Sequence, residues 1–543
     1  MEKELRDTPP SKRWATLLVV LVGLGLMALR FSPWPAVGGR DLFAHPYRPY
    51  YDETFQAILI ERAGDSSFPG HDPLVQAIEA FWPGSYFAIL AGAKRVLGGL
   101  EPTILVATFL VAAFFIWGCH RLGRLVTGST LGGALVALIS AAFPRDALIA
   151  EWGMETLVPR EVTMAAAPWL FEAFLRWGGK WRTSLLFLAL GLLANIHALS
   201  ALHLVLILAA ALLVSERRRG LRTLVLGAVL CGAGAAPVAL HFGGPPGAQP
   251  PEIELVLQSS FAYFVEPFFY KLTLLLTGFA LLFFPAVLGF ALALCGRSPS
   301  PERRFRAIMA ATVGVASLYA LTRLEPALVQ YSPLRVTKFF YLFAYVYGAF
   351  AVVSLLKHQG PPPRPILTRA LGLLLAACLV IPAGPRVWVK LRELWPAFDQ
   401  RCRLSASRLP DCFRMDVRIP AELDWDTFHE MASVVRERTP VDAVFLLPPR
   451  GFSPFRLYAR RAVVVLGEDS VVGLYDAETL RLWLERLTTV VAAYEDTEAA
   501  ALTGAAQRYG ADFIVLRPGD PALGNAPLLW EKAGWRIVAS GVR

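Results

Sequence analysis

Two adjacent carboxylates, Asp52 and Glu53, lie in the segment RPYYDETFQ (48–56), shortly after the first long apolar run. A positioned carboxylate can take the proton from a hydroxyl or amine that attacks an electrophilic carbon, so this pair is a candidate general base. Asp72, in the link SSFPGHDP (66–73), and Asp41 compete for the same role. The chemistry open to these acids depends on which groups lie opposite them.

Cationic and hydrogen-bonding residues occur near the ends of later apolar runs. A lipid-linked phosphate needs cationic partners, and the planar donor fork of Arg suits it well. Each residue also has a plain structural interpretation: a solvated charge, a helix-turn cap at His197, or anchors at the membrane interface at Arg335 and Lys338. The candidate substrate-binding residues are Arg160, Glu161, His197, Arg335 and Lys338.

The elements that must position these residues are membrane helices. Of the 543 residues 55% are hydrophobic and 18% are charged, whereas a soluble domain is typically about a quarter charged. A membrane helix needs about 20 mostly apolar residues. The segment 183–214 has basic residues at both ends and is too long for one span, so it predicts two short helices meeting at NIHALSALH (195–203). We therefore expect about eleven spans: 14–29, 102–119, 129–143, 164–174, 184–197, 201–214, 223–239, 272–295, 307–321, 339–356 and 370–381.

Basic clusters fix the expected orientation. Alternating spans bring five clusters to the side that also holds Lys12 and Arg13, and an excess of Lys and Arg marks the cytoplasmic side. The net charge of +10 is accounted for by these loops, so we do not expect nucleic-acid binding. Residues 30–101, 144–163, 242–271, 322–338 and everything after 384 then face outward. The clusters are residues 120–124, 176–182, 215–222, 296–306 and 357–369.

With this orientation the chain resembles the GT-C superfamily of integral-membrane glycosyltransferases, which use polyprenyl-phosphate sugars. Members have a cytoplasmic N-terminus, a long first outer loop with two surface helices, an Asp, often in an Asp-Glu pair, soon after the first span, and a soluble domain after the last. Here YYDETFQA (50–57) occupies the Asp position, and DETFQAILIERAG (52–64) and DPLVQAIEAFW (72–82) match the surface helices. The WWD motif of oligosaccharyltransferases has no counterpart. Segments similar to an uncharacterised bacterial branch with a C-terminal soluble domain are residues 157–171, 192–203, 330–343, 434–449 and 508–519.

The resemblance implies a polytopic α-helical membrane protein of GT-C type in residues 1–384, a linker in 385–422 and a small outward-facing α/β domain in 423–543. It implies hexosyl or pentosyl transfer from a polyprenyl-phosphate donor to a glycan, lipid or protein acceptor at the outer face of the bacterial cytoplasmic membrane. Asp52, Glu53 and Asp72 are the implied catalytic acids. A divalent cation is compatible with the outer-loop acids, but no spacing requires one.

Two other classes of function remain open from the sequence. One is a transporter or flippase of lipid-linked or small solutes, and the other is a non-catalytic membrane scaffold. Transporters often show internal repeats and ionisable residues near the bilayer midplane. This sequence has no convincing repeat, and its charges lie at the outer ends of the spans, which favours chemistry at the outer face.

The C-terminal region alternates predicted helices with predicted strands, which is typical of a small α/β layer domain. It has no glycine-rich nucleotide motif. FSPFRLYARR (452–461) with Arg450 is either a solvated basic face or a contact for lipid phosphates or an acidic glycan. Cys402 and Cys412 are either a disulfide or two free thiols, while the other cysteines fit small core residues. The expected helices are 424–438, 477–487 and 497–510, and the expected strands are 442–449, 461–467, 511–519 and 535–541.

Overall fold

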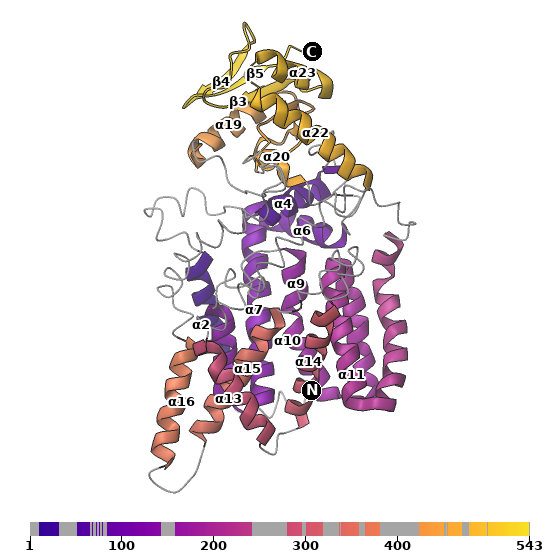
Figure 1. Ribbon diagram of the computed structural model, residues 1–543, viewed down its shortest axis with the longest axis vertical. Helices are drawn as coiled ribbons and strands as arrows, with labels where there is room; N and C mark the ends of the chain where they lie inside the picture. Colours follow the sequence, from indigo (N-terminus) through magenta and orange to yellow (C-terminus); the bar gives the residue numbers. More distant parts are fainter. Residues whose placement is uncertain are drawn as a thin grey trace. The chain divides into compact units, whose positions relative to one another are not determined.

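The computed structural model describes most of the helical chain and of the C-terminal domain (Figure 1). The disulfide alternatives at Cys402 and Cys412, and the expected boundaries at 384 and 422, lie outside the described residues. Those residues are 10–31, 51–65, 84–142, 158–241, 280–295, 300–318, 338–357, 364–380, 423–449, 454–469, 477–496 and 498–541, together with residues 68, 72, 75, 76, 79, 336 and 452.

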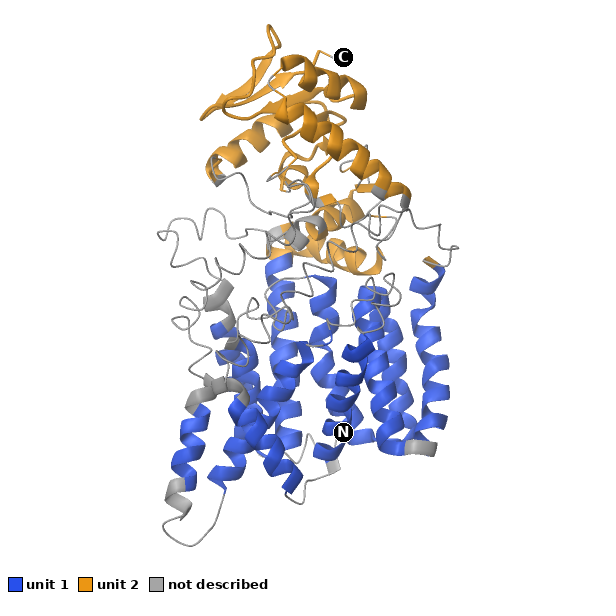
Figure 2. Ribbon diagram, viewed as in Figure 1, with its two compact units in different colours: residues 1–46, 104–240, 261–404 blue, residues 47–103, 241–260, 405–543 orange. Residues whose placement is uncertain are grey.

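The chain divides into two compact units (Figure 2). Unit 1 consists of residues 1–46, 104–240 and 261–404. Unit 2 consists of residues 47–103, 241–260 and 405–543. The segment 47–103 therefore belongs to the same unit as the C-terminal domain, although more than three hundred residues separate them in the sequence.

Unit 1 is helical, and each apolar run expected from the sequence overlaps at least one of its helices. Four described helical segments are long and apolar enough to cross a membrane: Pro102–Thr127, Trp181–Glu216, Arg219–His241 and Phe339–Leu356. These segments indicate a multi-pass membrane protein. The helices are α2 (Pro10–Phe31), α7 (Leu100–Thr127), α8 (Thr130–Ala142), α9 (Pro159–Ala165), α10 (Ala167–Trp177), α11 (Ser184–His241), α13 (Ala280–Cys295), α14 (Ser300–Ser317), α15 (Phe339–Leu356) and α16 (Arg364–Val380).

Helix α15 lies at the centre of unit 1 and packs against α8, α13 and α16. Thirteen of its residues are buried, so it is apolar around most of its circumference. Gly289 of α13 faces the backbone carbonyl of Tyr347, where any Cβ would collide with the oxygen. Small residues at such crossings allow two membrane helices to approach closely. This packing fixes the start of α15, where Lys338 lies.

Helix α11 is not straight. The hydroxyl of Ser184 donates to the carbonyl of Thr223 at 3.0 Å, although a straight helix would separate residues 39 positions apart by about 58 Å. The carbonyl of Gly234 accepts from Asn195 at 2.8 Å with the same spacing in sequence, so the two segments run parallel. The chain therefore reverses direction twice between them, as expected from two short helices meeting at 195–203.

The basic clusters of unit 1 are joined by ion pairs. Arg121 donates to both carboxylate oxygens of Glu172, which is buried. Arg304 donates to the carbonyl of Leu175 at 2.9 Å and to Glu216 at 3.1 Å. Four of the basic clusters therefore meet at one end of unit 1, as alternating spans require: 120–124, 176–182, 215–222 and 296–306.

Unit 2 combines two helices of the segment 47–103, the first loop of the chain, with a mixed five-stranded sheet. The loop helices are α4 (Tyr51–Gly64) and α6 (Gly84–Leu97), which pack against each other. The strand order is β2-β1-β3-β5-β4, with β1 parallel to β2 and β3, and β5 antiparallel to β3 and β4. The domain contains α19 (Trp425–Arg438), β1 (Val444–Leu446), α20 (Phe455–Ala459), β2 (Ala462–Val463), α22 (Ala477–Glu495), α23 (Ala499–Tyr509), β3 (Phe513–Leu516), β4 (Leu528–Lys532) and β5 (Trp535–Ala539).

The predicted helices and strands of the C-terminal domain are present, but β4 and α20 were missed. Strand β4 is an edge strand with only Trp530 buried, so it lacks a strong apolar signal. It joins β5 through Ala533 and Gly534, which both have positive φ values of 51° and 81°. Hairpin turns of this kind usually carry Asn-Gly or Asp-Gly. Because alanine takes the left-handed position here, the sequence lacks the Asn-Gly or Asp-Gly pair that would have predicted the turn.

The side chain of Asn195 bridges a proline site in α11. Pro237 interrupts the second segment, since proline cannot donate to the helical hydrogen-bond ladder. The Asn195 amide donates to the carbonyl of Gly234 at 2.8 Å and accepts from the N–H of Val238 at 3.0 Å. One amide thus contacts both backbone groups of the helical step that spans the proline.

Asn195→Leu should lower the unfolding free energy of unit 1 by about 1 kcal/mol, the usual size of an interhelical side-chain hydrogen bond in a membrane protein. Thermal melting of the purified protein in detergent measures this loss. Ser317→Ala is the control, because its hydroxyl bonds only to Val313 of its own helix. Equal melting temperatures for the wild type and Asn195→Leu would show that the bridge contributes nothing.

Candidate functional site

The adjacent acids singled out from the sequence lie at the start of a helix. Asp52 and Glu53 occupy the first turn of α4, while their side chains lie outside the described part of the structure. The helix continues with five consecutive buried residues, Gln56 to Ile60. A helix buried through its middle holds its ends in place, so the backbone of the acidic pair is attached to a fixed element.

The candidate substrate-binding residues belong to unit 1. Arg160 and Glu161 lie in the short helix α9, where Glu161 is buried. Lys338 is 5% exposed and immediately precedes α15. Its neighbour Phe339 packs on Phe171 of α10, with ring centroids 5.5 Å apart, and belongs to the same apolar cluster as residues of α9. Arg335 lies outside the described residues.

His197 has a structural role in the described geometry. Its Nδ1 accepts a hydrogen bond from the N–H of Ser200 at 3.1 Å. A side chain that accepts from the N–H three residues later acts as an N-cap, which starts a new helical segment. The substrate-binding role of His197 stays a prediction beside this capping role.

The third acid, Asp72, is part of a buried charge cluster. Arg456 donates from Nε to Asp72 at 2.6 Å, and from its two terminal nitrogens to Asp469 at 2.6 and 2.9 Å. All three side chains are at most 1% exposed. Two carboxylates around one guanidinium satisfy its fork, which is the condition for burying such charges.

Backbone N–H groups complete the coordination of the two acids. Asp72 also accepts from the N–H groups of Val75 and Val463, at 3.1 and 3.0 Å. Asp469 accepts from the N–H of Leu466 at 2.8 Å. Because Val463 belongs to the edge strand β2, Asp72 caps that edge of the sheet. A fully buried carboxylate with these partners is poorly placed to accept a substrate proton, so we keep the proposed base at Asp52 and Glu53.

The charge cluster shifts two pKa values. Burial lowers the pKa of the Arg456 guanidinium, but the carboxylates of Asp469 and Asp72 outweigh it and raise the pKa above its usual value. Burial raises the pKa of Asp469, and Arg456 opposes this only in part because the second carboxylate, Asp72, adds to the increase. Arg456 therefore stays charged.

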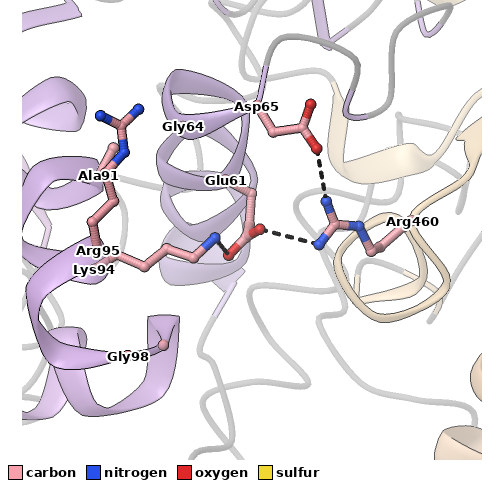
Figure 3. Close-up of a pocket in the computed structure, with 9 residues that line it drawn as sticks. Glu61, Gly64, Asp65, Ala91, Lys94, Arg95, Gly98 and Arg460 are labelled. Atoms are coloured by element: carbon pink, nitrogen blue, oxygen red, sulfur yellow. Dashed lines mark hydrogen bonds and ion pairs between the residues drawn. The ribbon is translucent and has the colours of Figure 1, made fainter.

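A pocket of about 370 Å³, with five charged side chains in its lining, lies between α4, α6 and the residue that follows α20 (Figure 3). Arg460 donates to Glu61 at 3.4 Å and to Asp65 at 3.2 Å, and Lys94 pairs with the other oxygen of Glu61 at 2.5 Å. Two of the pocket's cations are thus already paired with its own acids. The pocket is therefore a junction between α4, α6 and the C-terminal domain more than a site for an anionic ligand.

The basic segment 452–461 does not form a solvated face. Arg456 is 1% exposed and Arg461 is 3% exposed, so both sequence interpretations are wrong for these two residues. Arg461 donates to the carbonyls of Arg436 and Thr439 at 2.8 and 2.7 Å, at the C-terminus of α19. Cations commonly satisfy the last carbonyls of a helix in this way. Arg450 lies outside the described residues.

The described ranges contain no group of three or more His, Cys, Asp or Glu side chains that could hold a metal ion. The sequence did not demand such a group.

Comparison with known proteins supports the fold. Residues 426–490 match a domain of unknown function, DUF6798, and no curated protein matches the chain. The apo crystal structure of the Archaeoglobus fulgidus oligosaccharyltransferase is similar over 93% of this chain and 69% of that chain, with a TM-score of 0.53 and 12% identity. Its complex with Zn and sulfate gives 0.53 and 13% identity, over 92% of this chain and 67% of that one.

A third structure of that archaeal protein contains an inhibitory peptide and a dolichol-phosphate, and it gives a TM-score of 0.51 at 12% identity over 93% of this chain and 70% of that one. Identity this low shows a shared fold alone. The chain thus shares the fold of the archaeal oligosaccharyltransferase, which agrees with the fold expected from the sequence resemblance.

Asp72→Asn should destabilise unit 2 by roughly 3–5 kcal/mol, because removing one partner leaves a buried charge uncompensated. Asp65→Asn is the matched control: its carboxylate is 46% exposed in its pair with Arg460 and should cost less than about 1 kcal/mol. Hydrogen exchange of peptides covering 455–469 reports both effects. Equal protection in the two variants would contradict a structural role for Asp72.

Proposed function

We propose that this protein is a membrane glycosyltransferase that moves a sugar from a polyprenyl-phosphate donor to an acceptor at the outer face of the cytoplasmic membrane. The observation that carries the proposal is the fold shared with the archaeal oligosaccharyltransferase over 93% of the chain. The acidic pair after the first apolar helix adds the chemical group that such a transfer needs.

The proposed reaction is a single inverting displacement. The acceptor hydroxyl or amine attacks C1 of the donor sugar and forms the new C1–O or C1–N bond. The C1–O bond to the phosphate breaks, and the polyprenyl phosphate leaves with the electron pair. The acceptor's proton passes to the carboxylate of Asp52 or Glu53, which acts as the general base.

The leaving phosphate gains charge as the bond breaks, so cations beside it stabilise the transition state more than the ground state. Lys338, Arg160 and Arg335 are the proposed partners of that phosphate, and Glu161 and His197 the proposed partners of the sugar or acceptor. Lys338 is our first candidate among the described residues, because it immediately precedes α15 and its side chain is almost fully buried. A cation in a dry site binds an anion more strongly than one in water.

The single variants Asp52→Asn and Glu53→Gln show which of the two acids is the general base. We expect the variant of the true base to lose at least about a hundredfold in kcat, the usual contribution of general base catalysis. The other variant should lose much less. The assay follows release of labelled polyprenyl phosphate from polyprenyl-phosphate mannose, glucose or arabinose, with a membrane extract of the source organism as acceptor.

Glu485→Gln is the control for this experiment, since the Glu485 side chain is 56% exposed on α22 and pairs with Arg508. Full activity in both acid variants would exclude the proposed base. Protein-dependent movement of the intact donor across vesicles, without cleavage, would favour a flippase instead.

Lys338→Ala should raise the dissociation constant for polyprenyl phosphate about tenfold, because it removes a charge-assisted hydrogen bond. Lys338→Arg should recover part of the affinity. Lys357→Ala is the matched control at the other end of α15, where the ammonium donates to the carbonyl of Gly128 at 3.4 Å. Equal affinities in all three variants, each with unchanged melting, would remove Lys338 from the proposed donor site.

A further inference from the structure

Arg460 has an unusual backbone conformation for its residue type. It follows α20 with φ 56° and ψ 40°, in the left-handed region. Glycine, which has no Cβ, is the common residue at this position after a helix. A long side chain here carries backbone strain, and such strain persists where the surrounding contacts hold the residue in place.

The side chain of Arg460 contacts three residues of the first outer loop. Its two terminal nitrogens donate to Glu61 and Asp65, which lie one turn apart on and just after α4 (Figure 3). Its guanidinium also lies 4.5 Å from the ring centroid of Phe68. A planar fork over an aromatic face is a geometry that Arg can make and Lys cannot.

The same stretch of α4 is held from the other side. Lys94 of α6 pairs with the second oxygen of Glu61. Below this polar contact, Ile58, Phe68 and Val75 form an apolar cluster against which Leu457 of α20 packs. The C-terminal half of α4 is therefore fixed by an apolar contact and by a charged contact, both to the segment 456–460.

Helix α4 connects this contact to the acidic pair. From Asp52 to Glu61 is nine residues, which is about 13 Å along a helix axis. Residues 56–60 are buried, and the stretch 53–60 contains no glycine or proline that would let the helix bend. A shift or rotation at Glu61 is thus passed to the first turn.

We propose that Arg460 is a positioning residue for the transfer reaction: by holding the C-terminal half of α4, it sets the position of Asp52 and Glu53. This inference rests on the proposed function. The C-terminal domain then acts on the chemistry through α4, without touching the substrate.

Exposed ion pairs often contribute little to stability. The test therefore compares two variants of Arg460 with a control variant that breaks an exposed ion pair elsewhere in the C-terminal domain. Arg460→Gly removes the side chain and relieves the backbone strain, whereas Arg460→Lys keeps the charge and loses the planar fork. Arg508→Gln is the control, because it breaks a pair with Glu485 in which both side chains are more than half exposed. Hydrogen exchange of the peptide 51–64 and steady-state kinetics with the donor are measured on the full-length protein.

We expect Arg460→Gly to speed exchange in 51–64 by about tenfold, since local opening follows the loss of tertiary contacts. The same variant should lower kcat by about tenfold and leave the donor KM within about twofold, because the donor site itself is untouched. Arg460→Lys should recover part of both effects, and Arg508→Gln should change neither.

Unchanged exchange in Arg460→Gly would show that Arg460 does not hold α4. Faster exchange with unchanged kcat would overturn the positioning role while leaving the contact itself intact. A wild-type protein without transfer activity would end the proposed function and with it the catalytic part of this inference. The exchange result would still decide whether Arg460 holds α4, so the two failures are distinguishable.

Discussion

The buried guanidinium of Arg456 is the interaction on which unit 2 depends. It joins Asp72 of the segment 47–103 to Asp469 of the C-terminal domain, with every charge hydrogen-bonded and all three side chains at most 1% exposed. Removing one partner of a buried charge cluster costs several times more free energy than an exposed ion pair contributes. The cluster therefore allows only one arrangement of the segment 47–103 and the C-terminal domain. That arrangement and the contacts of Arg460 together fix the position of helix α4 within unit 2, and the acidic pair lies in the first turn of this helix.

Unit 1 follows a different logic, in which close helix packing and a few polar bridges define the fold. Gly289 lets α13 approach the backbone of α15, and Asn195 bridges the proline site in α11. Arginines of the basic clusters pair with Glu172 and Glu216 at one end of the unit. These contacts hold the helices of unit 1 against one another.

The sequence predicted the helices well, because apolar runs of membrane length are a strong signal. It also predicted most of the C-terminal strands, but β4 escaped because an edge strand and an Ala-Gly turn carry little pattern. The main failure was Arg456 and Arg461, which were interpreted as surface cations. A cation flanked by Phe455 and Leu457 in a short apolar segment was a signal of burial, but its partner Asp72 lies 384 residues away, and no local pattern connects them.

The central proposal is that this protein transfers a sugar from a polyprenyl-phosphate donor, with the acidic pair of α4 as its general base. A cryo-EM map of the full-length protein with added polyprenyl phosphate tests this most directly. The account predicts the phosphate within hydrogen-bonding distance of Lys338, Arg160 or Arg335, with Asp52 or Glu53 facing the open side where the sugar C1 would lie. A phosphate bound elsewhere, or both carboxylates directed into bulk solvent, would contradict it.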